Sequence, residues 1–307
     1  MTNNPQILVA ISCITYNHKD YLRQCLDGFV MQQTNSRFVA VVHDDCSTDG
    51  TTDILREYAE KYPEIIIPIY EEENLFQQGK MSEISRKVEE IITNSGAIYE
   101  AICEGDDYWT DPLKLQKQVD FLESHPDYSL CFHRCQTLIS ETGEIVDEFI
   151  VPDMPRESSI EDLSKGNYIH TLSVVYRRND EVQRKISSLG PCMPGDYVLW
   201  MMHAEKGKIW KFEEPMGVYR YGSGIWTTGR GLGNELAFLM TLVKLWMSID
   251  NPIAKQNLQQ QIDKQRQAII GYEEKEYKEL CSTRASKAYR IGKILTAPAT
   301  WWRKWKK

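Results

Sequence analysis

The sequence predicts an α/β fold in which a mostly parallel sheet is covered by helices. Apolar segments that suit buried strands alternate with segments of helical periodicity through the first half of the chain. This order is typical of parallel strands, because each helix returns the chain to the same edge of the sheet. Polar and acidic residues follow the predicted strands, which is where open α/β sheets bind ligands. The 307 residues suffice for one large domain with an appendage.

In the first half, the predicted strands are the apolar runs 7–15, 38–43, 65–70 and 97–103. Between them, apolar residues recur at helical spacing in 21–30, 51–62 and 81–93. Another helix is expected after the fourth strand, because Asp111 is a favoured cap residue and Pro112 suits the first helical position.

The second half is less regular. The predicted strands there are 129–139, 144–151, 169–176, 209–212 and 216–221. The predicted helices are 196–204, 236–249 and 253–280. We therefore expect a main α/β domain over residues 1–230, a helical appendage over 231–283 and a basic, tryptophan-rich tail over 284–307.

Charge is distributed unevenly along the chain. The formal net charge of −8 argues against nucleic acid as a partner. Residues 284–307 carry eight basic residues and no acids, so the rest of the chain carries −16. Tryptophan alternates with lysine and arginine in residues 301–307, a combination that favours an anionic membrane surface. The tail is therefore expected to be a peripheral membrane anchor, and a solvated tail is the alternative.

The cellular compartment follows from the cysteines and the N-terminus. The eight cysteines form no CxxC pair or zinc-type spacing, which suits a reducing cytosol. Residues 1–6 lack the basic region of a signal peptide, and no apolar run is long enough to span a bilayer. We expect a cytoplasmic protein that is peripheral on the inner face of the cell membrane.

A cluster of acids is the most informative feature of the chain. Glu104, Asp106 and Asp107 directly follow the fourth predicted strand. Carboxylates placed so closely repel one another unless a positive group neutralises them, and a divalent cation held by oxygen ligands is the natural candidate. An acidic surface turn is the alternative for the cluster taken alone. The runs 15–17 and 44–45 end two other predicted strands, so a parallel sheet brings all three groups to one edge.

Taken together, these runs resemble the family-2 glycosyltransferases of the GT-A fold. The matching segments are 12–17, 44–51 and 104–107, and the resemblance covers roughly residues 7–226. It implies transfer of a sugar from a nucleotide-diphosphate donor, with inversion at the anomeric carbon. A hexosyl or N-acetylhexosaminyl group would pass to a hydroxyl of a saccharide or lipid-linked acceptor.

The resemblance also implies roles on the donor side. Thr15 and Asp45 would contact the base, and a UDP-sugar is favoured because Asp45 can accept from the uracil N3–H group. Asp106 would bind Mn²⁺ or Mg²⁺ on the diphosphate, and Glu104 would reach the ribose or a metal-bound water. A bound cation stabilises the charge that builds on the leaving diphosphate. The full set expected on the donor side is Thr15, Tyr16, Asn17, Asp45, Lys80, Glu104 and Asp106.

Inversion needs a base on the acceptor side. The family places an acid at the start of a helix well after the acid cluster, and Asp196 occupies that position. Asp196 is the expected general base, with a helix cap as the alternative role. Asp107, Trp109 and Trp200 are the other candidates for the acceptor side. Asp107 can instead lie behind the metal ligand, and the hydrophobic core is the favoured place for the Trp200 ring.

Two positions depart from the family. Cys46 stands where glycine is usual, so this turn is expected to need no positive φ. Gly222 stands where histidine is common, which leaves the third protein ligand of the metal open, with His170 and His203 as candidate substitutes. These departures keep a second function open, a non-catalytic protein of this fold that binds a glycan or nucleotide. The sugar, the acceptor, the metal and the oligomeric state stay open, and helix pairing between chains is one option.

Overall fold

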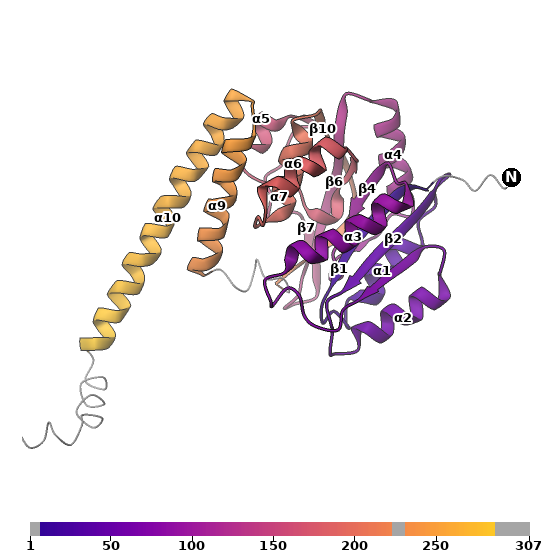
Figure 1. Cartoon of the computed structure of the whole chain (residues 1–307), viewed down its shortest axis with the longest axis horizontal. Coiled ribbons are helices and arrows are strands. Elements are labelled where there is room, and N and C mark those ends of the chain that lie inside the picture. The colour runs from indigo at the N-terminus through magenta and orange to yellow at the C-terminus, as the bar shows by residue number, and fades with distance from the viewer. Residues whose placement is uncertain (1–6, 223–230, 286–307) are drawn as a thin grey trace, which may run out of the picture.

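The computed structural model describes residues 7–222 and 231–285. One sheet runs through this part of the chain in the order β3-β2-β1-β4-β9-β6-β10-β5, with β7 paired to β6 and β8 paired to β10 (Figure 1). The first four strands are β1 (Ile7–Thr15), β2 (Arg37–Asp44), β3 (Ile66–Tyr70) and β4 (Tyr99–Ile102). They pair only in parallel with one another, as the sequence predicts for this half.

Helices cover both faces of this parallel part. The helices of the first half are α1 (Leu22–Val30), α2 (Thr51–Lys61), α3 (Met81–Ser95) and α4 (Lys114–Ser124). The buried side of α1 packs with Ile11 and Val42, while the buried side of α3 packs with Ala10 and Val41. Alternate residues of one strand thus supply two cores, because successive side chains of a strand point to opposite faces.

The second half of the sheet is mixed in direction. Its strands are β5 (Tyr108–Trp109), β6 (Tyr128–Ile139), β7 (Glu144–Asp147), β8 (Glu157–Ser158), β9 (Val175–Arg177) and β10 (Lys208–Tyr221). β9 lies antiparallel between β4 and β6, and β10 is parallel to β6. The two strands expected at 209–212 and 216–221 are one strand with shifts in register between Phe212 and Gly217.

The expected strand over 169–176 is largely wrong. Residues Thr171–Ser173 form a 3₁₀ turn, η1, and only the short β9 follows it. The hydroxyl of Ser173 donates to the carbonyl of His170, a local bond of the kind that competes with strand pairing. Two helices had no predicted counterpart, α5 (Ile160–Leu163) and α6 (Asp180–Leu189).

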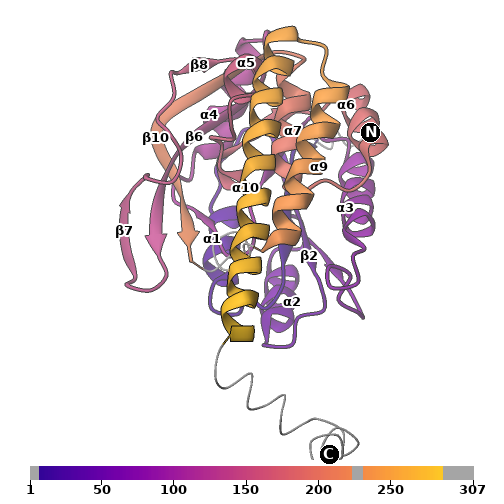
Figure 2. The same cartoon turned by 90° about the vertical axis from the view of Figure 1, so that its left-hand side faces the viewer.

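The remaining helices are α7 (Gly195–Ala204), α9 (Leu232–Ser248) and α10 (Pro252–Ala285). Figures 1 and 2 both show α9 and α10 side by side against the α7 side of the sheet. Leu242 and Leu245 of α9 share one buried cluster with Trp200 of α7. The Gln261 side chain of α10 donates to the Tyr197 hydroxyl at 2.9 Å. The helices of the expected appendage therefore pack directly on α7.

None of the described helices is long and apolar enough to cross a bilayer. The tail over 284–307 lies almost wholly outside the described residues, so its expected membrane role stays a prediction.

Candidate active site

The ends of β1 and β2 are tied together by short polar contacts. The amide of Asp45 donates to the carbonyl of Thr15 at 3.1 Å. The amide of Asn17 donates to the Ser47 hydroxyl at 2.9 Å, and the Asn17 side chain accepts from the amide of Thr48 at 2.9 Å. These bonds hold Asn17 in the left-handed region with φ of 53°, which asparagine tolerates better than most residues. The strand ends thus form a fixed rim, as the topology predicts.

Asp45 is a buried anchor at this rim. Its carboxylate accepts from the amides of Leu75 and Phe76 at 2.8 and 3.0 Å, and its carbonyl accepts from the Asn74 side chain at 3.2 Å. A carboxylate has about four lone-pair positions, so two amide bonds do not exhaust it. Lys80 follows this loop and is exposed at the N-cap position of α3.

The expectation for Cys46 was wrong. Cys46 adopts a φ of 62°, the left-handed conformation that glycine takes more easily. Its thiol donates to the carbonyl of Glu72 at 3.3 Å, a contact that glycine could not make. The turn therefore keeps its shape without glycine.

Gly105 lets residues 104–107, the acid segment, lie directly on the end of β1. A Cβ atom at this position would stand 2.7 Å from the Thr15 hydroxyl oxygen and 2.9 Å from Nδ1 of His18. The Gly105 amide donates to the carbonyl of Ile14 at 3.0 Å, which fixes this approach. Thr15 Oγ1 and His18 Nδ1 are buried, and neither has a hydrogen-bond partner in the described part of the chain. Two orphaned polar atoms thus lie beneath the acid segment.

Arg220 of β10 holds the acid segment from its other side. Its amide donates to the Asp107 carboxylate at 2.7 Å, and its Nε donates to the carbonyl of Asp106 at 2.8 Å. The guanidinium also donates to the Gln24 side chain at 3.1 Å and lies 4.3 Å from the centre of the Tyr21 ring. No role for Arg220 was predicted from the sequence.

Asp107 is therefore not an acceptor-side group, contrary to the sequence-based expectation. Its side chain is only 3% exposed and is occupied by the Arg220 amide. Burial, together with the charge of Asp106, raises the pKa of Asp107 well above its usual range. Asp107 fixes the position of β10 against the acid segment.

Asp196 joins the acid segment from the first turn of α7. Its carboxylate accepts from the amide of Tyr197 at 2.7 Å and makes longer contacts of 3.4 Å with the side chains of Asn167 and Thr171. Burial raises its pKa above the ordinary value, while these donors oppose that shift. The fold thus brings the partly buried carboxyl of Asp196 near the acid segment, although Asp196 lies ninety residues after Asp106 in the sequence.

The charges of Asp106 and Asp196 both act on Glu104. Burial, followed by the charges of Asp106 and Asp196, raises the pKa of Glu104. The Glu104 side chain is itself open to water, which screens part of the repulsion. Burial and then the nearby acids raise the pKa of Tyr219 as well. Glu104, Asp106 and Asp196 therefore form one acidic site at the strand ends.

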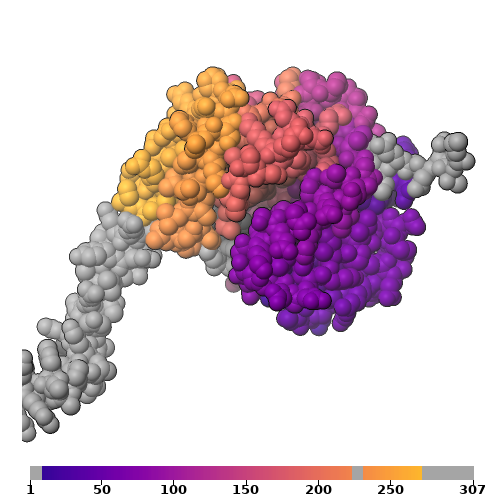
Figure 3. Space-filling view, viewed as in Figure 1, coloured from indigo at the N-terminus to yellow at the C-terminus, as the bar shows by residue number. Residues whose placement is uncertain are grey.

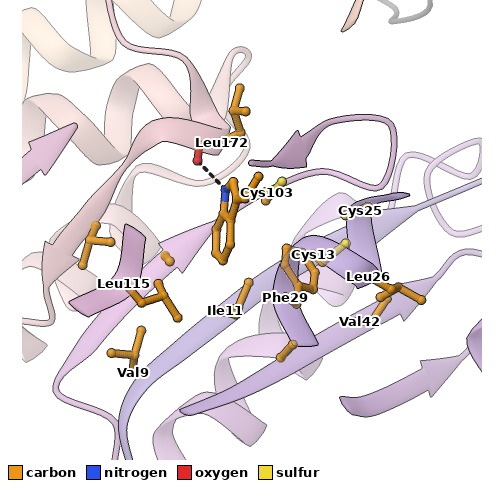
Figure 4. Packing of buried hydrophobic residues seen from close by; sticks show 14 of the residues in the cluster. Val9, Ile11, Cys13, Cys25, Leu26, Phe29, Val42, Cys103, Leu115 and Leu172 are labelled. Atoms are coloured by element: carbon orange, nitrogen blue, oxygen red, sulfur yellow. Dashed lines mark hydrogen bonds between the residues drawn. The ribbon is translucent and has the colours of Figure 1, made fainter. Parts of the chain in front are cut away.

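Of the two tryptophans named for the acceptor side, Trp109 was wrongly assigned, while Trp200 occupies the hydrophobic core that was also expected for its ring. Trp109 is 2% exposed, and its indole donates to the carbonyl of Leu172 at 2.8 Å, the dashed line in Figure 4. Phe29 contacts the same ring edge-on at 5.0 Å. Trp200 is fully buried in the cluster of α7 and α9. Neither ring can meet a substrate, because each is buried in a hydrophobic core.

A buried cation also contacts Trp109. The Lys114 ammonium lies 4.1 Å from the centre of the indole ring and donates to the Gln118 side chain at 2.7 Å. Burial lowers the pKa of Lys114 to about 7.

The acidic site formed by Glu104, Asp106 and Asp196 fits a cation that has few protein ligands. Within 7–222 and 231–285, no group of three or more acid, histidine or cysteine side chains is arranged to hold a metal. The candidate substitutes do not complete one, since His170 is bonded to Glu148 at 2.6 Å and His203 is buried against Tyr176. Hard oxygen donors at Asp106, with repelling carboxylates around it, suit Mg²⁺ or Mn²⁺ whose other ligands are phosphate and water. Gly222 has a φ of 99°, and the residues that follow it lie outside the described chain.

Comparison with known proteins shows which family this chain resembles. The model of the family described as "Glycosyl transferase family 2" matches residues 11–178. Rv1520 of Mycobacterium tuberculosis is 36% identical over 251 residues, which are 76% of this chain and 68% of that protein. TuaG of Bacillus subtilis, named as a glycosyltransferase of teichuronic acid biosynthesis, is 29% identical over 65% of this chain and 73% of its own.

Solved structures share the architecture at low sequence identity. Residues 1–349 of Staphylococcus aureus TarS in complex with UDP-GlcNAc superpose with a TM-score of 0.61 at 13% identity, covering 84% of this chain and 72% of that one. The mannosyltransferase PcManGT of Pyrobaculum calidifontis, in complex with GDP-Man and Mn²⁺, gives a TM-score of 0.54 at 17% identity, covering 99% and 84%. These likenesses confirm the expected GT-A fold with its helical C-terminal region.

Proposed function

Because the chain belongs to glycosyl transferase family 2, we propose that it is an inverting, metal-assisted glycosyltransferase. It moves a sugar from a nucleotide-diphosphate donor, with UDP-sugars preferred, to a hydroxyl of a saccharide or lipid-linked acceptor. The observation that carries this proposal is the carboxylate of Asp196, which is held by three donors and lies close enough to Glu104 for its charge to act on that side chain.

Asp196 is the general base in this proposal. Its raised pKa makes the carboxylate a better proton acceptor than an ordinary aspartate, while the Tyr197, Asn167 and Thr171 donors orient it. As the acceptor oxygen attacks the anomeric carbon, its proton passes to this carboxylate and the nucleoside diphosphate leaves from the opposite face. Inversion follows from a single displacement of this kind.

The donor lies along the strand ends in this proposal. Thr15, Tyr16, Asn17 and Asp45 form its base side, and Asp106 holds the divalent cation with the diphosphate. When bound, the cation neutralises charge on the leaving diphosphate. Glu104 is exposed and can reach the ribose or a bound water. Lys80 is exposed after the Asp45-anchored loop, within the segment expected near the diphosphate.

The preference for uridine rests on Asp45. Its carboxylate has lone pairs left for the N3–H group of uracil after bonding the two loop amides, but it is 1% exposed, so this contact requires the loop to open. The neighbouring structures hold both UDP-GlcNAc and GDP-Man, so the fold itself accommodates either base.

The tail adds a membrane role to the proposal. Eight basic residues and three tryptophans in 284–307 suit an anionic bilayer on the cytoplasmic side, where a lipid-linked acceptor would be presented. Deleting residues 297–307 is expected to weaken binding to anionic vesicles and to leave turnover of a soluble acceptor unchanged.

The decisive experiment compares Asp196→Asn with the wild type. Nucleoside diphosphate release is measured across a donor screen, with and without acceptor extract. The variant should keep the donor KM and lose at least ~10²-fold in kcat, because only the transition state needs the proton accepted. Asp180→Asn, at an exposed first-turn position of α6, is the matched control and should behave as wild type.

Other outcomes contradict the proposal in distinct ways. A variant whose donor affinity collapses places Asp196 on the donor side, and an unchanged kcat removes it from catalysis. A wild-type protein that binds donors but releases no nucleoside diphosphate in any combination favours the non-catalytic alternative.

A further inference from the structure

The outer side of α9 is an apolar stripe on the surface of the molecule. Leu236, Met240 and Met247 are 45%, 57% and 71% exposed, and their spacing places them on one face of the helix. Val243 lies between them and is partly buried. Apolar surface gathered in this way on a soluble domain marks an interaction site more often than scattered residues do. Figure 3 shows α9 on the outside of the molecule next to α10.

The stripe carries almost no charge. Over Leu232–Ser248 the charged residues are Glu235 and Lys244. The Glu235 carboxylate accepts from the Gln265 side chain of α10, and the Lys244 ammonium donates to the carbonyl of Pro191 at 2.6 Å. Both charges are thus engaged by the protein beside the stripe. This is unusual in a chain whose part outside 284–307 carries −16.

The charge distribution identifies the partner. An anionic bilayer repels a body of −16, so a chain tethered by a basic tail can rest on the membrane only through a face without acids. The α9 stripe is such a face, and α9 packs along α10, the helix from which the basic tail continues. One weak membrane signal gives marginal binding, whereas apolar contact plus a basic cluster gives stable binding.

We propose that the exposed face of α9 is a second membrane-contact surface, which lies on an anionic bilayer while the basic tail attracts the chain to it. This inference rests on the membrane role proposed for the tail. It also predicts how the domain is oriented on the bilayer, because α9 is bonded to the loop that leads to Asp196. The Met193 amide donates to the Thr241 hydroxyl of α9 at 2.8 Å, and Lys244 bonds the same loop at Pro191. Docking α9 therefore sets the position of α7 and its carboxylate relative to the bilayer.

The test is flotation of the full-length protein with vesicles of neutral lipid containing one third phosphatidylserine, at low and high salt. Met240→Glu/Met247→Glu places two negative charges on the stripe without touching a buried side chain. It is expected to lower vesicle partitioning at least tenfold at both salt concentrations. The matched control is Ile98→Glu/Leu113→Glu, which makes the same charge change at two exposed apolar residues away from α9. Ile98 directly precedes β4, and Leu113 is the N-cap of α4. This control should partition as wild type.

Donor turnover on a soluble acceptor separates this inference from the proposed function. The stripe variant should retain wild-type release of nucleoside diphosphate, so a loss confined to flotation supports the inference. Flotation equal to wild type, or lost only on deletion of 297–307, assigns the membrane contact to the tail alone and overturns it. A wild-type protein that ignores the vesicles at low salt overturns it as well. If light scattering shows a wild-type oligomer that the stripe variant dissociates while flotation is unchanged, the stripe is an interface between copies and the inference is wrong.

Discussion

Substituting Gly105 by alanine tests how closely the acid segment must lie on β1. The new methyl group would stand 2.7 Å from Thr15 Oγ1, 2.8 Å from Thr15 Cβ and 2.9 Å from His18 Nδ1. Ordinary contact begins near 3.4 Å, so the segment or β1 must shift by about 0.7 Å. Thr15 is fully buried and its carbonyl accepts from the Asp45 amide, so it cannot rotate out of the way without disturbing the rim.

Overpacking of this kind costs about 1–3 kcal/mol of unfolding free energy. The shift also moves Glu104 and Asp106 away from the β1 end, so the donor KM should rise together with the loss of stability. Urea unfolding measures the first effect, and donor KM with nucleoside diphosphate release measures the second.

Gly207→Ala provides the steric control. A Cβ at Gly207 would lie 2.8 Å from the carbonyl of Asp127 and from the amide of Ser129, so the crowding is similar. Because Gly207 packs at the start of β10 and away from the acids, this variant should lose stability and keep the donor KM. A Gly105→Ala protein with wild-type stability and wild-type KM would refute the close-approach reasoning. Equal KM increases in both variants would show that the effect is general destabilisation.

Three further outcomes are expected. Asp106→Asn should lose most Mn²⁺-dependent donor binding and turnover with the fold intact, and calorimetry showing unchanged affinity would contradict the metal assignment. UDP should bind more tightly than GDP, because Asp45 can accept from uracil N3–H, and equal or tighter GDP binding would reject that preference. Lys114 has a pKa of about 7 in the folded protein and about 10.4 when unfolded, so between these values the unfolded state binds more protons and stability rises with pH. In the wild type the free energy of unfolding should rise by up to ~1.4 kcal/mol between pH 7 and 8, and Lys114→Met should lack this rise in urea melts. A variant with the same pH slope as the wild type would argue against a neutralised lysine.

Local pattern was sufficient for the parallel half of the fold. The strands and helices up to β4 follow from apolar periodicity, because the central strands β1, β2 and β4 are largely buried and each helix is buried on one side. The helix expected at Asp111 begins at Lys114 instead, and Asp111 bonds the amide of Leu113 within the preceding turn. In β10, the irregular register near Pro215 divided one strand into two apparent ones. Such boundaries depend on tertiary contacts that a single sequence does not display.

The candidate site was predicted where the acids themselves carry the chemistry. Asp106 and Asp196 were named from the family resemblance, and the fold places both close enough to act electrostatically on Glu104. Arg220 was not assigned a role because its partners lie 113 and 114 residues away, at Asp107 and Asp106. Trp109 was misassigned because an aromatic residue next to acids gives no sign of which face it occupies. Its burial is decided by β5 pairing with β10, a contact between distant segments.

The packing of α9 and α10 on α7 has a consequence for biosynthesis. Leu242, Leu245 and Ile249 are fully buried against the helix that carries Asp196, and Gln261 bonds its Tyr197. During synthesis, the parallel strands can collapse as soon as they leave the ribosome, because their partners precede residue 103. The helix with the proposed base cannot complete its packing until residues 232–262 have also emerged. A nascent chain thus completes the proposed donor side before the proposed acceptor side, and a product truncated near residue 230 would expose apolar surface to chaperones and proteases.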